Sequence, residues 1–242
     1  MTEAAIKAAA RAHPTQARRE EGHLAVWAAS TGVIGVLALG SSFAIVPHPP
    51  ALAASVSILN AYARTHHDVL LWSAWLEGTG SLLYVVYLIA LVQLAGAMRR
   101  ISGVLTVLAG AAVLSISLVY DICLIAIAQS TSAGGSQLAT GVTAYGLWAG
   151  TEHAFLLAPS IFLPLGFALR GSRDVHPIYP QLAIVLGCAS EILGLVGLFY
   201  SHPNNAGAIG LAINALIGAQ ALWVLATATR TLRTAALTSR EQ

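Results

Sequence analysis

The chain has 242 residues, of which 57% are hydrophobic and only 9% are charged, and its mean hydropathy is +0.74. A soluble domain carries about 25% charged residues, so these values favour a membrane protein. They exclude a disordered chain, a collagen, a nucleic-acid module and a disulfide scaffold, while the net charge of +2 indicates no partner by itself.

Apolar stretches divide the chain into candidate membrane spans, since about 20 apolar residues cross a hydrocarbon core about 30 Å thick. Six such stretches lie at about 23–46, 69–98, 101–129, 140–169, 178–200 and 206–229. Turn-forming sequences rich in proline, glycine, serine or asparagine separate most of them. The predicted fold is therefore all-α, a polytopic bundle of six transmembrane helices over residues 23–230, between tails at 1–22 and 231–242.

The basic residues predict how this bundle is oriented. Eleven of the 12 Lys and Arg residues lie in the N-terminal tail, the 99–100 turn, the 170–177 loop and the C-terminal tail, which leaves only Arg64 on the other side. Because cytoplasmic loops are rich in Lys and Arg, both termini are predicted to be cytoplasmic. We expect a multi-pass protein of a bacterial inner (plasma) membrane, with the lipid bilayer around it and no nucleic-acid partner.

The segment at about 51–65 differs from the spans because it is short and partly polar. Leu52, Val56, Leu59 and Ala63 recur in it at helical spacing. We expect a short amphipathic helix at the outer membrane interface, lying over the mouth of the bundle. An ordinary ordered loop is the alternative.

Four acidic residues fall inside the predicted spans, where a charged group costs at least a few kcal/mol. They are Glu77, Asp121, Glu152 and Glu191. At a rise of about 1.5 Å per residue, all four lie about 12–17 Å below the outer boundary, and Asn214 of the last span falls in the same layer. No Lys or Arg lies inside the spans to pair with them. We therefore predict a polar layer of candidate catalytic carboxyls.

Small and aromatic residues share the helix faces of these polar groups. Glu77 shares its face with serines, glycine and a tyrosine, Asn214 with two glycines, and Glu152 with two aromatic residues. Small residues mark helix–helix contacts in membranes, so we expect the acids to face the bundle interior. The predicted ligand pocket is lined by Tyr84, Tyr145, Trp148, His153 and Asn214.

Carboxyls that lie close together in a low dielectric cannot all ionise, and a neutral acid beside a carboxylate can serve as general acid and general base. The favoured hypothesis is an intramembrane pocket that binds or converts a lipophilic, isoprenoid-like small molecule. Three alternatives stay open: a proton relay in a transporter, a divalent cation bound with His153, and protonated carboxyls that only hold helices together. Whether the protein is an enzyme is left open too.

A set of histidines forms a separate metal-binding alternative on the predicted outer side. These residues are His48, His66, His67 and His202. Imidazoles with the nearby Asp68 can bind copper or zinc, whereas histidines in interfacial loops need no ligand. No histidine box, HExxH motif or zinc pattern occurs, and the adjacent Glu152 and His153 lack the Glu-x-x-His spacing of di-iron bundles. The sequence predicts no cofactor.

Two stretches carry a resemblance to a known family. Leu76-Glu77-Gly78 leads to the turn Met98-Arg99-Arg100, and the fourth span closes with Phe167-Ala168-Leu169-Arg170 before a glycine-rich fifth span. Over roughly residues 23–230, the chain resembles a large bacterial family of six-helix integral membrane proteins of unknown function. The resemblance implies a fold and a membrane location only.

Overall fold

The computed structural model describes residues 3–47, 50, 54–130, 141–144, 146–147, 161–172, 175–200 and 206–240, without the side chains of 3–21, 197–200, 206–209 and 237–240. The helices are α1 (Glu3–Ile45), α2 (Val56–Thr65), α3 (His67–Leu94), α4 (Ile101–Gln129), α6 (Phe162–Leu169), α7 (Ile178–Tyr200) and α8 (Ala206–Arg240). Every labelled element in the described part is an α-helix, which confirms the predicted all-α fold.

Five helices within the described residues are long and apolar enough to cross a membrane. The stretches are Gly22–Ile45, His67–Leu94, Ile101–Gln129, Ile178–Val196 and Gly210–Ala236. Large apolar side chains such as Leu108, Ile122, Val185 and Leu222 are 61–68% exposed on these helices. So much exposed apolar surface suits lipid rather than water. The surface therefore supports a multi-pass membrane protein.

The predicted fourth span, 140–169, lies mostly outside the described residues. Its described parts are helical residues at 141–144 and 146–147 and the short helix α6. The total of six spans therefore stays a prediction.

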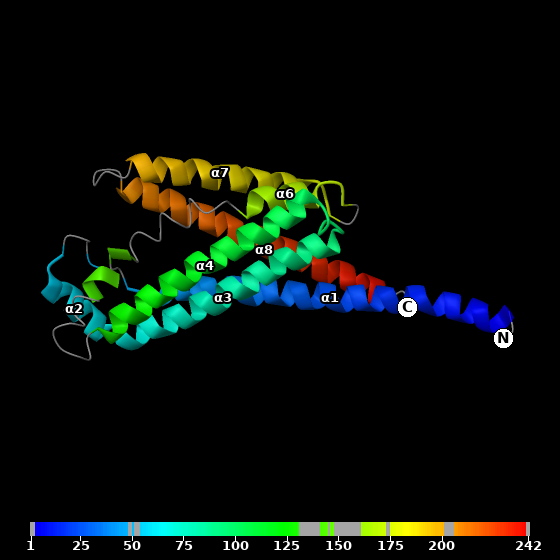
Figure 1. The fold of residues 1–242 in the computed structure, drawn as a ribbon, viewed down its shortest axis with the longest axis horizontal. Helices are drawn as coiled ribbons and strands as arrows, with labels where there is room; N and C mark the ends of the chain where they lie inside the picture. The colour runs from blue at the N-terminus through cyan, green and yellow to red at the C-terminus, as the bar shows by residue number, and fades with distance from the viewer. Residues whose placement is uncertain are drawn as a thin grey trace.

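Figure 1 shows the long helices running roughly along the long axis of the molecule, with α1 extending beyond the others at its N-terminal end. Helix α1 packs against α3 and α8, α3 packs against α4, and α7 packs against α6 and α8. Among the described elements, α7 contacts neither α3 nor α4. This arrangement decides which of the predicted acids can meet.

Glycines hold α1 and α3 together at backbone distance. A Cβ added to Gly35 would lie 2.7 Å from the backbone nitrogen of Tyr84, and one added to Gly80 would lie 2.8 Å from that of Leu39. Neither position has room for a side chain, so the two backbones touch along this seam. Small residues permit such close helix packing in membranes.

A core of aromatic and aliphatic side chains joins α3, α6 and α8. Tyr87 of α3 is fully buried, and its hydroxyl donates a hydrogen bond of 2.8 Å to Thr227 of α8. Phe162 of α6 packs edge-on against Trp223 of α8, with ring centroids 5.3 Å apart. The Trp223 indole N–H is satisfied by the backbone oxygen of Tyr179, 3.0 Å away. Apolar packing and satisfied polar tips together fix these three helices.

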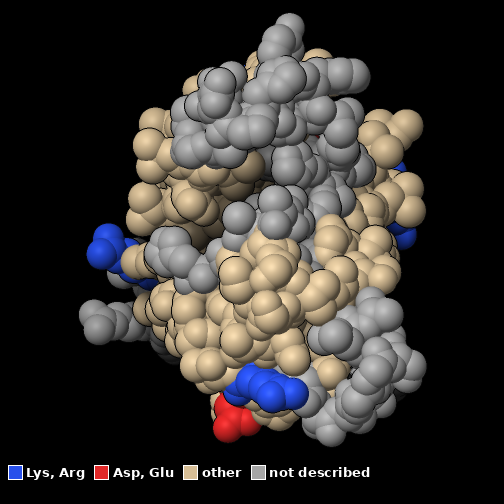
Figure 2. All heavy atoms as spheres, turned by 90° about the vertical axis from the view of Figure 1, so that its left-hand side faces the viewer, with Lys and Arg blue, Asp and Glu red and all other residues tan. Residues whose placement is uncertain are grey.

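Charged residues separate the two ends of the bundle. At one end, named here the basic end, Arg100 donates to the backbone oxygen of Arg170 over 3.2 Å, and Arg230 lies over the ring of Tyr179. The opposite end carries α2 and is named the α2 end. Figure 2 views the molecule from that end, where uncharged residues make up most of the described surface. The predicted orientation, with the basic end in the cytoplasm, stays a prediction.

Helix α2 falls within the predicted segment 51–65. Ala63 is buried against α3 and α4, while Val56 and Ile58 are exposed. Leu52 lies outside the described residues. A helix is present here, and its placement at a membrane interface stays a prediction.

Candidate functional site

Two of the predicted acids meet between α3 and α4. Glu77 is 1% exposed and Asp121 is 7% exposed, and both lie in membrane-length helices. Glu77 lies ten residues after the start of α3, and Asp121 lies eight residues before the end of α4. At about 1.5 Å per residue both therefore lie about 12–15 Å from the α2 end of their helices. Since α3 and α4 pack together, the side chains of Glu77 and Asp121, which lie at the same level of the two helices, are close to each other.

Two serine hydroxyls donate to the same oxygen of Glu77. Ser81, one turn further along α3, donates to Oε1 over 3.2 Å, and Ser117 of α4 donates to Oε1 over 2.8 Å. Ser117 lies one turn before Asp121, so α4 brings a donor and a carboxyl to the same face. Hydroxyl donors favour negative charge on the oxygen that accepts them.

The other carboxyl oxygens define the chemistry of the pair. The carboxyl of Asp121 lies within hydrogen-bonding reach of the Glu77 carboxyl. Glu77 Oε2 and Asp121 Oδ1 are nevertheless buried without a donor among the described residues. Two bare carboxylates can only accept, so a hydrogen bond between them requires a proton on one of them. A proton shared by the two groups would remove one charge from the membrane interior.

The absence of a side chain at residue 78 makes room for Asp121. A Cβ on Gly78 would lie 2.5 Å from Asp121 Oδ2, closer than atoms in contact approach. Gly78 follows Glu77 directly in α3. The dipeptide thus provides one carboxyl and the space for the other.

Polar groups continue from the pair towards the α2 end. Ser73 lies one turn before Glu77 in α3, and its hydroxyl hydrogen-bonds the hydroxyl of Ser42 in α1 over 2.9 Å. Both serines are buried. In the opposite direction, beyond Ser81, Val85 and Leu88 lie in the core, and the hydroxyl of Tyr87 bonds Thr227 of α8. Described polar side chains thus occur on both sides of the pair, and those towards the α2 end are the serines of α1 and α3.

The remaining described site residues lie away from the pair. Glu191 is partly buried on α7, which does not contact α3 or α4. Asn214 is exposed on α8, and a Cβ at neighbouring Gly210 or Gly218 would meet no described atom within 4 Å. Tyr84 lies two turns along α3 from Glu77 and packs towards Phe162, with ring centroids 6.5 Å apart. The roles predicted for these three residues stay predictions.

Several predicted site residues lie outside the described part of the chain. These are Tyr145, Trp148, Glu152, His153, His48 and His202. Of the histidines with described positions, His67 Nδ1 lies 2.8 Å from Asp68 Oδ1, and the ring of His66 packs against Tyr62. Within the described residues, no group of three or more His, Cys, Asp or Glu side chains could hold a metal ion.

Sequence reasoning missed some of the residues that surround the pair. Ser117 donates a hydrogen bond to Glu77, and Ser42 shares one with Ser73. Gly78 has no side chain and so leaves room for the Asp121 carboxyl. The spacing of Ser117, four residues before Asp121, was a usable signal for the first. Nothing in the sequence tells which residue of α1 meets Ser73.

Comparisons with protein-family models, with curated proteins and with solved structures find no match to this chain. The function is therefore inferred from the geometry of the carboxyl pair.

Proposed function

We propose that the protein binds or converts a lipophilic, isoprenoid-like molecule by acid/base chemistry at Glu77 and Asp121. In this proposal it is an integral membrane protein of a bacterial inner (plasma) membrane, with both termini in the cytoplasm. One observation carries the proposal. Two buried carboxyls lie within hydrogen-bonding reach of each other in membrane-length helices, and each keeps an oxygen for which no described residue supplies a donor. A charge at such depth is expensive and is usually functional.

The hydrogen bonds support different roles for the two groups. Glu77 Oε1 accepts from Ser81 and Ser117, which favours Glu77 as the carboxylate and general base. Asp121 then holds the proton and acts as the general acid. A neutral acid beside an ionised one is the arrangement that lets one site both give and take a proton. The reacting bond is left unspecified, because acid and base of this kind serve several reactions of a lipophilic molecule.

The distribution of polar groups favours a site that opens to one membrane face over a proton-coupled transporter. Ser42 and Ser73 lead from the pair towards the α2 end, while beyond Ser81 the hydroxyls of Tyr87 and Thr227 bond each other. A proton-coupled transporter would need a polar path to both faces. It remains the alternative, and a Glu77-dependent proton flux through proteoliposomes would favour it.

The proposal is tested with a lipophilic carbodiimide, dicyclohexylcarbodiimide, which adds to protonated carboxyls that an apolar molecule can reach. The full chain in membranes at neutral pH is treated with this reagent, digested and analysed by mass spectrometry. We expect an adduct on the peptide that contains Glu77 or Asp121. The Glu77→Gln/Asp121→Asn double variant should lose it.

An exposed acid provides the control for reagent access. The side chain of Asp68 is 90% exposed, so it should react with a water-soluble carbodiimide whether or not the buried pair reacts. Absence of a lipophilic adduct on the wild-type pair, with Asp68 labelled, would refute access of an apolar molecule. The double variant would then be expected to unfold with the same free energy as the wild type, because the Gln and Asn amides can replace the hydrogen bonds of protonated carboxyls. That result would assign the pair to helix packing.

A further inference from the structure

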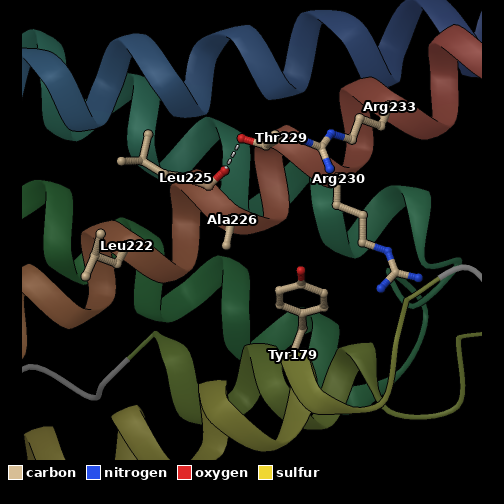
Figure 3. Close-up of a pocket in the computed structure, with 7 residues that line it drawn as sticks. All are labelled: Tyr179, Leu222, Leu225, Ala226, Thr229, Arg230 and Arg233. Carbon is tan, nitrogen blue, oxygen red and sulfur yellow. Dashed lines mark hydrogen bonds between the residues drawn. The ribbon is translucent and has the colours of Figure 1, made fainter.

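A second polar feature lies at the basic end, far along the chain from the carboxyl pair. A groove of about 590 Å³ opens between α7 and α8, and Figure 3 shows the side chains that line it. Those used below are Tyr179, Leu222, Leu225, Thr229, Arg230 and Arg233. The groove thus combines a cationic part and an apolar part on one helix.

Two arginines form the cationic part. Arg230 is partly buried, and its guanidinium carbon lies 5.5 Å from the centre of the Tyr179 ring. Arg233 follows three residues later and therefore lies on the same side of α8. Within the described residues, no carboxylate forms an ion pair with either arginine. Two neighbouring cations that no described carboxylate neutralises can form a site for an anion, and phosphate oxygens suit the guanidinium geometry.

Apolar residues extend the same face of α8 into the membrane-length segment. Leu222 is 68% exposed and Leu225 is partly buried, and both line the groove with Arg230. They precede Arg230 by five to eight residues, which places them about 8–12 Å further along the helix axis. This distance leads from the cationic part into the Gly210–Ala236 stretch. Thr229 adds a hydroxyl between the two parts.

We infer that this groove binds an anionic phospholipid of the leaflet at the basic end. The arginines hold the headgroup phosphate, and one acyl chain lies along Leu222 and Leu225. Charge complementarity supplies the first contact, and basic pockets between membrane helices are known places for anionic headgroups. The apolar continuation favours a lipid over a soluble anion, because a free phosphate would leave that surface unused. This inference does not depend on acid/base chemistry at Glu77.

Native mass spectrometry of the detergent-solubilised full chain tests the inference, with phosphatidylglycerol as the anionic lipid and phosphatidylcholine as the neutral one. We expect retained phosphatidylglycerol adducts and few phosphatidylcholine adducts. The Arg230→Gln/Arg233→Gln variant should bind phosphatidylglycerol roughly thirtyfold more weakly, which is about 1 kcal/mol for each arginine. Arg64→Gln, at the α2 end, is the matched control and should bind as the wild type does.

Two further variants keep the result interpretable if the double variant folds poorly. Arg233→Gln removes an exposed side chain and should weaken binding about fivefold. Arg230→Lys/Arg233→Lys keeps both charges but loses the guanidinium geometry, so its binding should lie between that of the wild type and that of the double Gln variant.

Three results would overturn the inference. These are equal phosphatidylglycerol binding by wild type and Arg233→Gln, equal retention of phosphatidylcholine by the wild type, and full displacement of the lipid by an equimolar amount of soluble glycerol phosphate. The last result would indicate a free-phosphate site instead.

Discussion

Substitution of Gly78 by alanine should separate the two carboxyls without removing either one. The new Cβ would lie 2.5 Å from Asp121 Oδ2, whereas ordinary contact begins at 3.4 Å. The Asp121 carboxyl must therefore withdraw by about 1 Å, a shift that the end of a side chain can make. We expect this movement to disturb the contact with the carboxyl of Glu77, which occupies the preceding position in α3.

The expected magnitude follows from two opposing effects. Alanine is favoured over glycine inside a helix by about 1 kcal/mol. Loss of a charge-assisted hydrogen bond between the carboxyls costs about 1.5–3 kcal/mol. A matched variant isolates the second effect: Gly40→Ala in α1, where the new Cβ would meet nothing within 4 Å. Gly78→Ala should be less stable than Gly40→Ala by about 2 kcal/mol.

The assay combines unfolding in detergent with infrared spectroscopy of the carbonyl stretch of protonated carboxyls. Loss of the carboxyl–carboxyl hydrogen bond should raise the frequency of that band in Gly78→Ala, and Asp121→Asn should remove it if Asp121 holds the proton. Equal unfolding free energies for the two alanine variants, together with an unchanged band, would refute the contact between Gly78 and Asp121 and the shared proton that depends on it.

Further variants test the surroundings of the pair and the core, each by its unfolding free energy in detergent. Ser117→Ala removes a donor to Glu77 and should cost about 1–2 kcal/mol, whereas Ser115→Ala, whose exposed hydroxyl bonds only within its own helix, should be near neutral. Tyr87→Phe breaks the hydroxyl bond from α3 to α8 and should cost about 1 kcal/mol, and no loss would mean that the bond contributes little. Gly80→Ala should cost about 1–3 kcal/mol, because it inserts a methyl group against the backbone of α1, in contrast to Gly40→Ala.

The positions of the carboxyls along their helices could be predicted from the sequence, but their neighbours could not. Residue counts from the helix ends placed Glu77, Asp121 and Glu191 at similar depths, because helical rise is constant. Lateral position depends on which helices pack together, and this is set by contacts such as that of Gly35 with Gly80. As a result, Glu77 and Asp121 meet, whereas Glu191 lies on a helix that contacts α6 and α8.

The helical fold was predictable for a simpler reason. Inside a membrane every backbone polar group must be satisfied within the segment, so long apolar stretches have few alternatives to a helix. The second span, expected at 69–98, is found as His67–Leu94. The last span was expected to end at 229, whereas its apolar stretch runs to Ala236. The N-terminal tail was predicted only as a separate segment, yet it continues the first span as part of α1.

The unbroken course of α1 has a mechanical consequence. Its 43 residues amount to about 65 Å, of which the 19 residues before Gly22 form a lever about 28 Å long. A tilt of the membrane segment by about 10° would displace the far end of that lever by about 5 Å. Because α1 and α3 touch backbone to backbone at Gly35 and Gly80, a tilt of α1 together with the helix that carries Glu77 would reach the part of α1 that extends beyond the bundle.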